Sequence, residues 1–239
     1  MGKLLFHLRL PIATCLVICN IPSTVVAVVQ IVTFNNPSPI VIPAGAPGVT
    51  SGPAAPFPST IDIGESGTIN DVKVHIHGIS HTFPNDIGGM LVGPGGQGVP
   101  LFVRPGGGED IVDLDWTFDD SAADPLPDSG QLESGTFVPS NHEPSFNFDA
   151  PAPASPSGTA LSVFDGTDLL GPWNLYVQDF IGGDTGNIAE GWSLEIEYTP
   201  AAAVVAPEPL SIVVWSLLGL ATVGAIQLRS WNWRATGRD

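Results

Sequence analysis

Basic residues and cysteine are scarce in this chain of 239 residues. Only 7 Lys and Arg stand against 24 Asp and Glu, which gives a formal net charge of −17. This balance argues against a nucleic-acid partner, because phosphate contacts require clustered cations. The two cysteines, Cys15 and Cys19, both lie in an apolar N-terminal segment. A mature body lacking that segment would have neither a disulfide nor a reactive thiol.

The few cations are placed unevenly. Between Val28 and Ala206 only Lys73 and Arg104 are basic, whereas all but two of the 24 acidic residues lie there. Carboxylates that lie close together repel one another unless a cation is shared between them. The body of the chain is therefore strongly acidic, and a divalent cation becomes a candidate ligand.

The N-terminal segment, residues 1–27, has the pattern of a secretory signal peptide. Lys3 and Arg9 form a positive start, an apolar run follows from Leu10, and Val25-Val26-Ala27 supplies small residues for cleavage. The alternative is an N-terminal membrane anchor that is not cleaved. Either interpretation predicts export across the cytoplasmic membrane.

The C-terminal segment, residues 207–239, also has the pattern of a targeting signal. Pro207-Glu208-Pro209 precedes an apolar run over 210–228, which Arg229 and Arg234 follow. The run is close to the ~20 residues that cross a bilayer as a helix, and trailing arginines favour a cytoplasmic end. This order resembles the bacterial PEP-CTERM sorting signal, which implies an exosortase-type sorting enzyme as a partner. The alternative is an ordinary C-terminal anchor, so both interpretations predict contact with the membrane through this span.

The region between these ends is predicted to be all-β. Residues 28–59 are rich in Pro, Gly and Ala and predict a linker, as do residues 200–206. Over 60–199, short alternating segments are separated by Gly- and Pro-rich turns. Val72, Val74 and Ile76, for example, share one face at a period of two. Many such strands predict an antiparallel sandwich or jelly roll.

Several motifs over about residues 60–198 carry a family resemblance. In order they are Ser80–Ile87, Leu91–Gly96, Phe118–Ala123, Gly135–Pro139, Leu161–Gly166, Gly171–Leu175, Val177–Asp179, Gly183–Gly186 and Gly191–Leu194. Together they resemble the P domain, or Homo B domain, of proprotein convertases and bacterial subtilisin-like proteases. The resemblance implies a jelly-roll-like β-sandwich. The segment 141–157 departs from the compact family pattern.

In the convertases, the P domain follows a catalytic subtilisin-like domain and stabilises it. No segment of this chain matches such a catalytic domain, and no serine lies in a Gly-x-Ser-x-Gly motif. We therefore expect a noncatalytic module with a binding or structural role at the bacterial surface or in an extracellular matrix, with a polysaccharide as a candidate partner. The alternative is an accessory role for a secreted subtilisin-like protease on a separate chain, and an enzyme ranks third.

Five aspartates are candidate calcium ligands because the resemblance places acids at loops or strand ends. They are Asp86, Asp119, Asp120, Asp179 and Asp184. Calcium binds six to eight oxygens, largely from carboxylates and carbonyls, and loops can converge at one end of a sandwich. The alternative is that these aspartates are solvated and cap turns by hydrogen-bonding their own backbone.

Other residues invite a functional interpretation that the sequence disfavours. His75 and His77 share a strand face, but structural zinc sites usually add cysteine ligands, so these histidines are expected to face solvent. Trp116, Trp173 and Trp192 are more consistent with a core than with a sugar-binding platform, because aromatic residues at alternating positions are usually buried.

Overall fold

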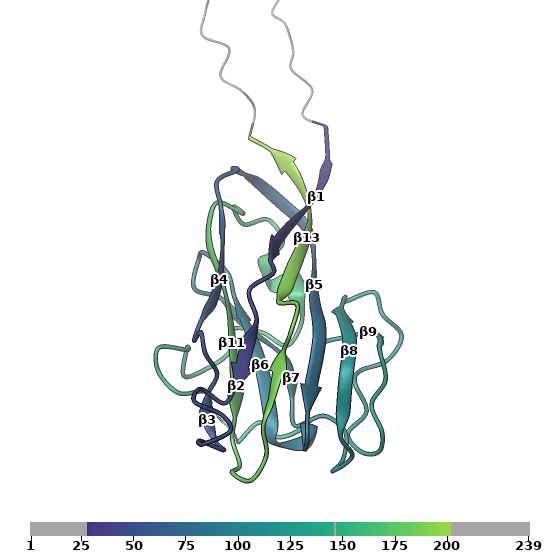
Figure 1. The fold of residues 1–239 in the computed structure, drawn as a ribbon. Helices are drawn as coiled ribbons and strands as arrows, with labels where there is room; N and C mark the ends of the chain where they lie inside the picture. The colour runs from purple at the N-terminus through teal and green to yellow at the C-terminus, as the bar shows by residue number, and fades with distance from the viewer. Residues whose placement is uncertain (1–27, 146, 202–239) are drawn as a thin grey trace, which may run out of the picture.

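A computed structural model describes residues 28–145 and 147–201, which form two facing β-sheets (Figure 1). Among these residues the helical segments are short 3₁₀ turns, η1 (Pro84–Asp86) and η2 (Leu161–Phe164). The prediction of an all-β sandwich is confirmed.

The first sheet has seven strands around the long strand β5. Its path runs β1-β13-β5-β12-β2, and β8 and β9 extend it beyond β5. The bounds are β1 (Gln30–Asn36), β2 (Ile40–Ile42), β5 (Gly67–His81), β8 (Ile111–Phe118), β9 (Gly135–Phe137), β12 (Gly186–Ile188) and β13 (Trp192–Pro200).

The second sheet has six strands and packs against the first. Its path runs β10-β7-β6-β11-β3, with β4 also paired to β11. The bounds are β3 (Gly52–Pro53), β4 (Ser59–Ile63), β6 (Ile87–Val92), β7 (Gly98–Val103), β10 (Ser140–Asn141) and β11 (Gly171–Asp179).

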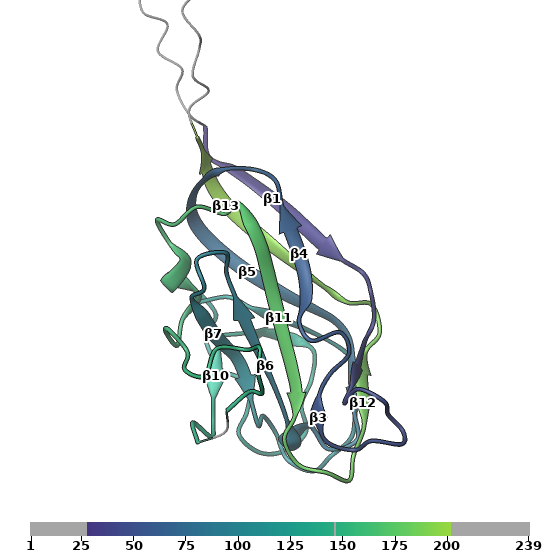
Figure 2. The same cartoon turned by 90° about the vertical axis from the view of Figure 1, so that its left-hand side faces the viewer.

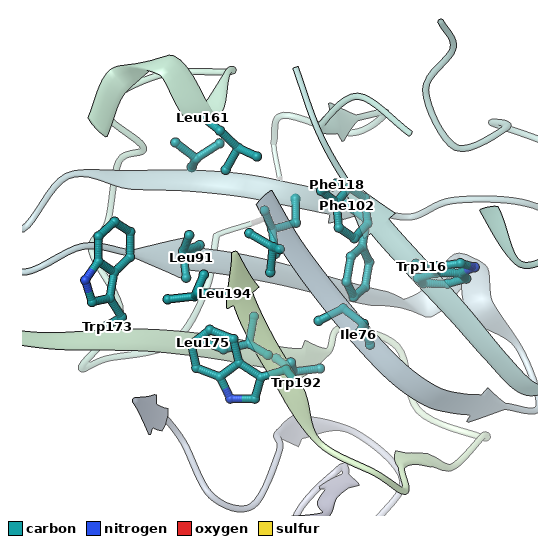
Figure 3. Close-up of a cluster of buried hydrophobic side chains, with 14 of the residues drawn as sticks. Ile76, Leu91, Phe102, Trp116, Phe118, Leu161, Trp173, Leu175, Trp192 and Leu194 are labelled. Carbon is teal, nitrogen blue, oxygen red and sulfur yellow. The ribbon is translucent and has the colours of Figure 1, made fainter. Parts of the chain in front are cut away.

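The main core lies between the two sheets, as the alternation of apolar residues predicts. Val72, Val74 and Ile76 all point inward from β5 and are at most 1% exposed. The predicted core tryptophans are also buried, with Trp116 and Trp173 at 0% and Trp192 at 1% exposure. Figure 3 shows these rings among the leucine, isoleucine and phenylalanine side chains of both sheets.

The prediction of a linker over 28–59 is wrong, because this segment contributes strands to both sheets. β1 pairs antiparallel with β13 over seven residues, and β2 pairs with β12. Ile40 and Ile42 are fully buried in the main core. The prolines lie in the turns between these short strands and at the edge strand β3, where a missing N–H costs no ladder bond. The high proportion of proline therefore indicated the turns correctly, but it led to the strands between them being assigned to a linker.

The segment that departs from the family pattern, 141–157, covers the outer face of the second sheet. Its Phe148 and Ala152 contact Met90, Val103 and Tyr176 in a second, smaller apolar cluster. The amide of Ser157 donates to the carbonyl of Gly98 and fixes the end of the segment. This cover explains why every residue of β6 and β7 is buried, because each strand then packs on both faces.

The two ends of the described region lie side by side. Gln30 of β1 pairs with Tyr198 of β13, so the chain enters and leaves at one end of the sandwich, which we term the terminal pole (Figure 1). The opposite end, where β5 ends at His81 and β11 at Asp179, we term the distal pole. The predicted signal peptide, sorting signal and span over 210–228 lie outside the described residues, as do residues 202–206 of the predicted linker 200–206, whereas Pro200 ends β13. Within residues 28–145 and 147–201, no helix is long and apolar enough to cross a membrane.

Candidate functional site

A β-bulge in β5 brings a histidine into the interior at the distal pole. The pairing of β5 with β8 shifts register between Ile76 and Ile79, and Gly78 adopts a φ of +67° that suits glycine. Before the bulge, odd-numbered His75 and His77 face outward, whereas His81 beyond it is 2% exposed. Strict alternation would place all three on the same outer face.

The buried imidazole of His81 faces protein groups on both nitrogens. Its Nδ1 accepts the backbone N–H of Phe83 at 3.1 Å, so the ring is neutral and carries its proton on Nε2. That nitrogen lies 3.2 Å from Oδ2 of Asp179, and neither side chain is exposed to solvent.

The contact between His81 and Asp179 is close but not well aligned. Among the described residues, neither Nε2 of His81 nor Oδ2 of Asp179 completes a hydrogen bond of good geometry. The other carboxylate oxygen of Asp179 accepts the backbone N–H of Ile181 at 3.0 Å. Buried polar atoms without a full hydrogen bond are rare and costly, so this pair is a strained element of the interior.

Asp86, at the end of η1, is the third buried polar residue of this group. It is 4% exposed, and removal from water together with repulsion by Asp179 raises its pKa to about 6. The positive charge of Arg104 acts in the opposite direction. The backbone carbonyl of Asp86 accepts the N–H of Phe180, which ties η1 to the end of β11. We refer to His81, Asp86 and Asp179 as the distal group.

Asp184 lies near the distal group on the loop that follows β11. Its carboxylate accepts the hydroxyl of Thr82 at 2.9 Å, and that hydroxyl in turn accepts the N–H of Thr185 at 3.1 Å. Asp184 therefore joins the loops that follow β5 and β11.

The other two predicted ligands, Asp119 and Asp120, follow β8 and form a separate lateral pair. Asp119 contacts Lys73 at 3.5 Å and accepts the N–H of Ser121. Burial alone would raise the pKa of Asp119, but these donors hold it below its ordinary value. The two oxygens of Asp120 accept the backbone N–H groups of Leu161 and Ser162 at 2.9 and 2.8 Å, which anchors η2.

The structure thus divides the five predicted calcium ligands between two places. Asp86, Asp179 and Asp184 gather at the distal pole, whereas Asp119 and Asp120 lie beside β5 and η2. No group of three or more acidic or histidine side chains within 28–145 and 147–201 is arranged to hold a metal. Asp119, Asp120, Asp179 and Asp184 each accept at least one protein donor, whereas Oδ2 of Asp179 has no full hydrogen bond to any described residue. As they stand the residues do not fit a calcium site, and calcium binding stays a prediction from sequence.

The outer face of the first sheet carries a polar ladder in place of a zinc site. His75 lies 3.0 Å from the Thr117 hydroxyl through Nδ1, and His77 lies 2.9 Å from the Ser193 hydroxyl through Nε2. Partial burial lowers the pKa of His75, so this ring is neutral near pH 7. The prediction that both histidines lie opposite the apolar face of β5 is confirmed.

The distal group has the components of an Asp–His couple but not the arrangement of a general base. In a catalytic triad the carboxylate orients the imidazole, and the other ring nitrogen faces the nucleophile. In His81 that other nitrogen accepts the N–H of Phe83. The geometry supports a structural role, in which polar contacts hold the segments that follow β5 and β11 together at the distal pole.

Comparisons with known proteins leave the family open. No family model matches the chain, and no curated protein matches it. Among solved structures, the complex of Aeromonas sobria serine protease with the chaperone ORF2 aligns with 72% of this chain and 28% of the matched chain, at 14% identity and a TM-score of 0.36. The A. sobria serine protease alone aligns with 71% of this chain and 27% of the matched chain, at 14% identity and a TM-score of 0.34. The chain spans less than a third of the proteins it matches, and likeness this low assigns neither family nor activity.

Proposed function

We propose that the sandwich is a noncatalytic binding or structural module, exported and held at the bacterial surface or in the extracellular matrix. The observation that carries the proposal is the pairing of β1 with β13, because both ends of the domain leave at the terminal pole. A domain joined to a C-terminal membrane span in this way would present its flanks and its distal pole to the exterior. The predicted signals at 1–27 and 207–239 supply the export and the anchor.

The polar residues of the candidate site bond to other groups of the protein, which supports a noncatalytic role. Both nitrogens of His81 face protein groups, and Asp120 and Asp184 fix η2 and the distal loops. Loops that are held by such bonds on a β-sandwich provide a stable surface for recognition. In this proposal the acidic side chains keep the module soluble and select against anionic partners.

The alternative, support of a separate subtilisin-like protease, rests on the motif resemblance. Many residues of the motifs that carry this resemblance lie in the core, including Trp173 of β11 and Trp192 of β13. Core motifs describe a fold more directly than a partner, so we rank this alternative second.

The test is to incubate the purified full chain, in mild detergent, with isolated cell envelopes, with extracellular polysaccharide and with secreted proteases. The proposal predicts saturable retention by envelopes or polysaccharide and no hydrolysis of casein. Retention by a secreted protease alone would favour the accessory role. Turnover of casein that copurifies with the chain would overturn the noncatalytic assignment.

A further inference from the structure

The outer edge of β1 is an open strand edge. Among residues 28–145 and 147–201, the backbone of β1 pairs with β13 and with no other strand. Figure 2 shows β1 along one margin of the sandwich, with β13 on its inner side. β1 also lies near β4 of the second sheet, and at the end of β1 the side chain of Asn36 donates to Ser59 and Thr60.

This edge lacks the features that usually protect an exposed strand. From Val28 to Asn36 it contains no charged residue, no proline and no glycine. The pairing with β13 is regular throughout, so no bulge bends the strand away. Its outward side chains include Ile31, which is 64% exposed. Natural proteins protect such edges with lysine, proline or a bulge because an open edge accepts another strand.

The charge beside this edge selects the kind of strand that fits. Ile31 pairs with Glu197 of β13, which in turn pairs with Asp71 of β5, so two carboxylates lie next to each other on the outer face. Burial and the nearby acids, Glu197 among them, raise the pKa of Asp71. Two residues further along β1, Thr33 pairs with Glu195. Lys73 forms an ion pair with Glu195, but it also contacts Asp119.

A second copy of this chain would bring the same excess of carboxylates to the interface. A basic strand would instead point its long side chains toward Glu197, about 10 Å away at the ~5 Å spacing between strands. Asp71, one strand further, is beyond direct contact and adds to the negative potential of this face. The inward side chains of β1, including Val32 and Phe34, are half-buried against the core. The fitting partner is therefore an extended segment with basic residues on one face and apolar residues on the other.

We propose that the outer edge of β1 binds an extended, basic polypeptide segment by adding it as a strand to the first sheet. Backbone hydrogen bonds supply the affinity and the acidic row supplies the preference for lysine and arginine. This inference deepens the proposed function and depends on it only in taking the sandwich as a binding module.

The test uses the full chain in mild detergent and a short, end-capped peptide in which lysine alternates with valine. Binding is measured by fluorescence anisotropy, and the paired strand is located by hydrogen exchange. The proposal predicts saturable binding and slower exchange at amides within 30–36. Methylating alternate backbone nitrogens of the peptide keeps its charge but abolishes binding, because it blocks the strand ladder.

Matched variants separate edge pairing from general attraction to an acidic protein. Ile31→Lys adds a positive charge at the edge and weakens binding about tenfold or more. Val112→Lys, at a residue of β8 that is 73% exposed, makes the same change away from β1 and leaves binding within about twofold.

Three results would overturn the proposal. They are no binding of the lysine–valine peptide at millimolar concentration, equal binding of the methylated peptide, and dimerisation of the chain that Ile31→Lys abolishes. The last would assign the edge to a second copy. If the peptide fails while envelopes still retain the chain, strand addition is wrong and the proposed function stands.

Discussion

Aspartate side chains have opposite effects on stability in the distal group and in the lateral pair. At the distal pole, Asp86 and Asp179 are 4% and 1% exposed and lie close enough to repel each other, and Asp179 faces His81 at 3.2 Å. In the lateral pair, Asp120 accepts two backbone N–H groups and Asp119 contacts Lys73. Carboxylates that accept backbone donors stabilise a fold at neutral pH, whereas a buried carboxylate with a raised pKa opposes it.

The largest expected effect is from Asp179→Ala. The substitution leaves the N–H of Ile181 without its acceptor, removes the carboxylate that faces Nε2 of His81 and opens a small cavity, so the free energy of unfolding should fall by about 3 kcal/mol. Urea unfolding of the purified chain at pH 7 measures this loss. Stability equal to that of the parent would show that the distal group is not a structural element.

The next effect depends on pH and concerns Asp86→Asn. The pKa of Asp86 is about 6 in the fold, above its unfolded value of about 3.9. The folded state therefore binds the proton more tightly, and the stability from this group is complete below about pH 4 and is lost as pH rises toward 6. The cost at pH 7 approaches about 3 kcal/mol, at 1.36 kcal/mol for each unit of pKa difference.

Asp86→Asn should therefore raise the midpoint of thermal unfolding at pH 7.5 and leave it nearly unchanged at pH 4. The matched control is Asp184→Asn, at the partly exposed acid of the same pole. A gain for Asp86→Asn that is equal at both pH values would contradict the raised pKa.

A smaller effect is expected from Asp120→Ala in the lateral pair. The change removes the acceptor for the backbone N–H groups of Leu161 and Ser162, and loss of such a cap costs about 1 kcal/mol. Hydrogen exchange at residues 161–164 should accelerate before the rest of the sandwich opens. If instead Asp120→Ala destabilises the domain more than Asp179→Ala does, the contrast between the two groups is reversed.

Calcium is expected to have the smallest effect. The five candidate aspartates are divided between two places, and no group of three or more within the described residues is arranged to hold an ion, so millimolar calcium should leave the unfolding midpoint where a chelator leaves it. A rise in the midpoint that Asp179→Asn abolishes would support the calcium prediction and place the ion at the distal pole. A rise that Asp119→Asn abolishes would place the ion at the lateral pair.

How far the sequence predicts the structure depends on the range of each signal. Alternation of apolar residues gave the strand at Val72–Ile76 and the burial of Trp116, because such patterning is local. It missed β2, which lies between prolines and has too few residues to show a period, and β1, which was assigned to the linker together with the proline-rich stretch that follows it. These strands depend on pairing with β13 and β12, which follow far along the chain.

The site was less predictable than the fold. The interior position of His81 depends on one glycine at a bulge, which reverses the alternation within β5. Gly78 in an alternating run was the available signal, because glycine inside a strand often marks a bulge. The division of the five aspartates into two groups follows from which loops share a pole, and this requires the strand topology.

The central claim, that this sandwich is a surface module which binds without catalysis, is tested most directly by sedimenting isolated cell envelopes with increasing amounts of the purified full chain. The account predicts saturable cosedimentation that excess unlabelled chain competes away. Retention that rises linearly and is not competed, or no retention at all, would contradict it.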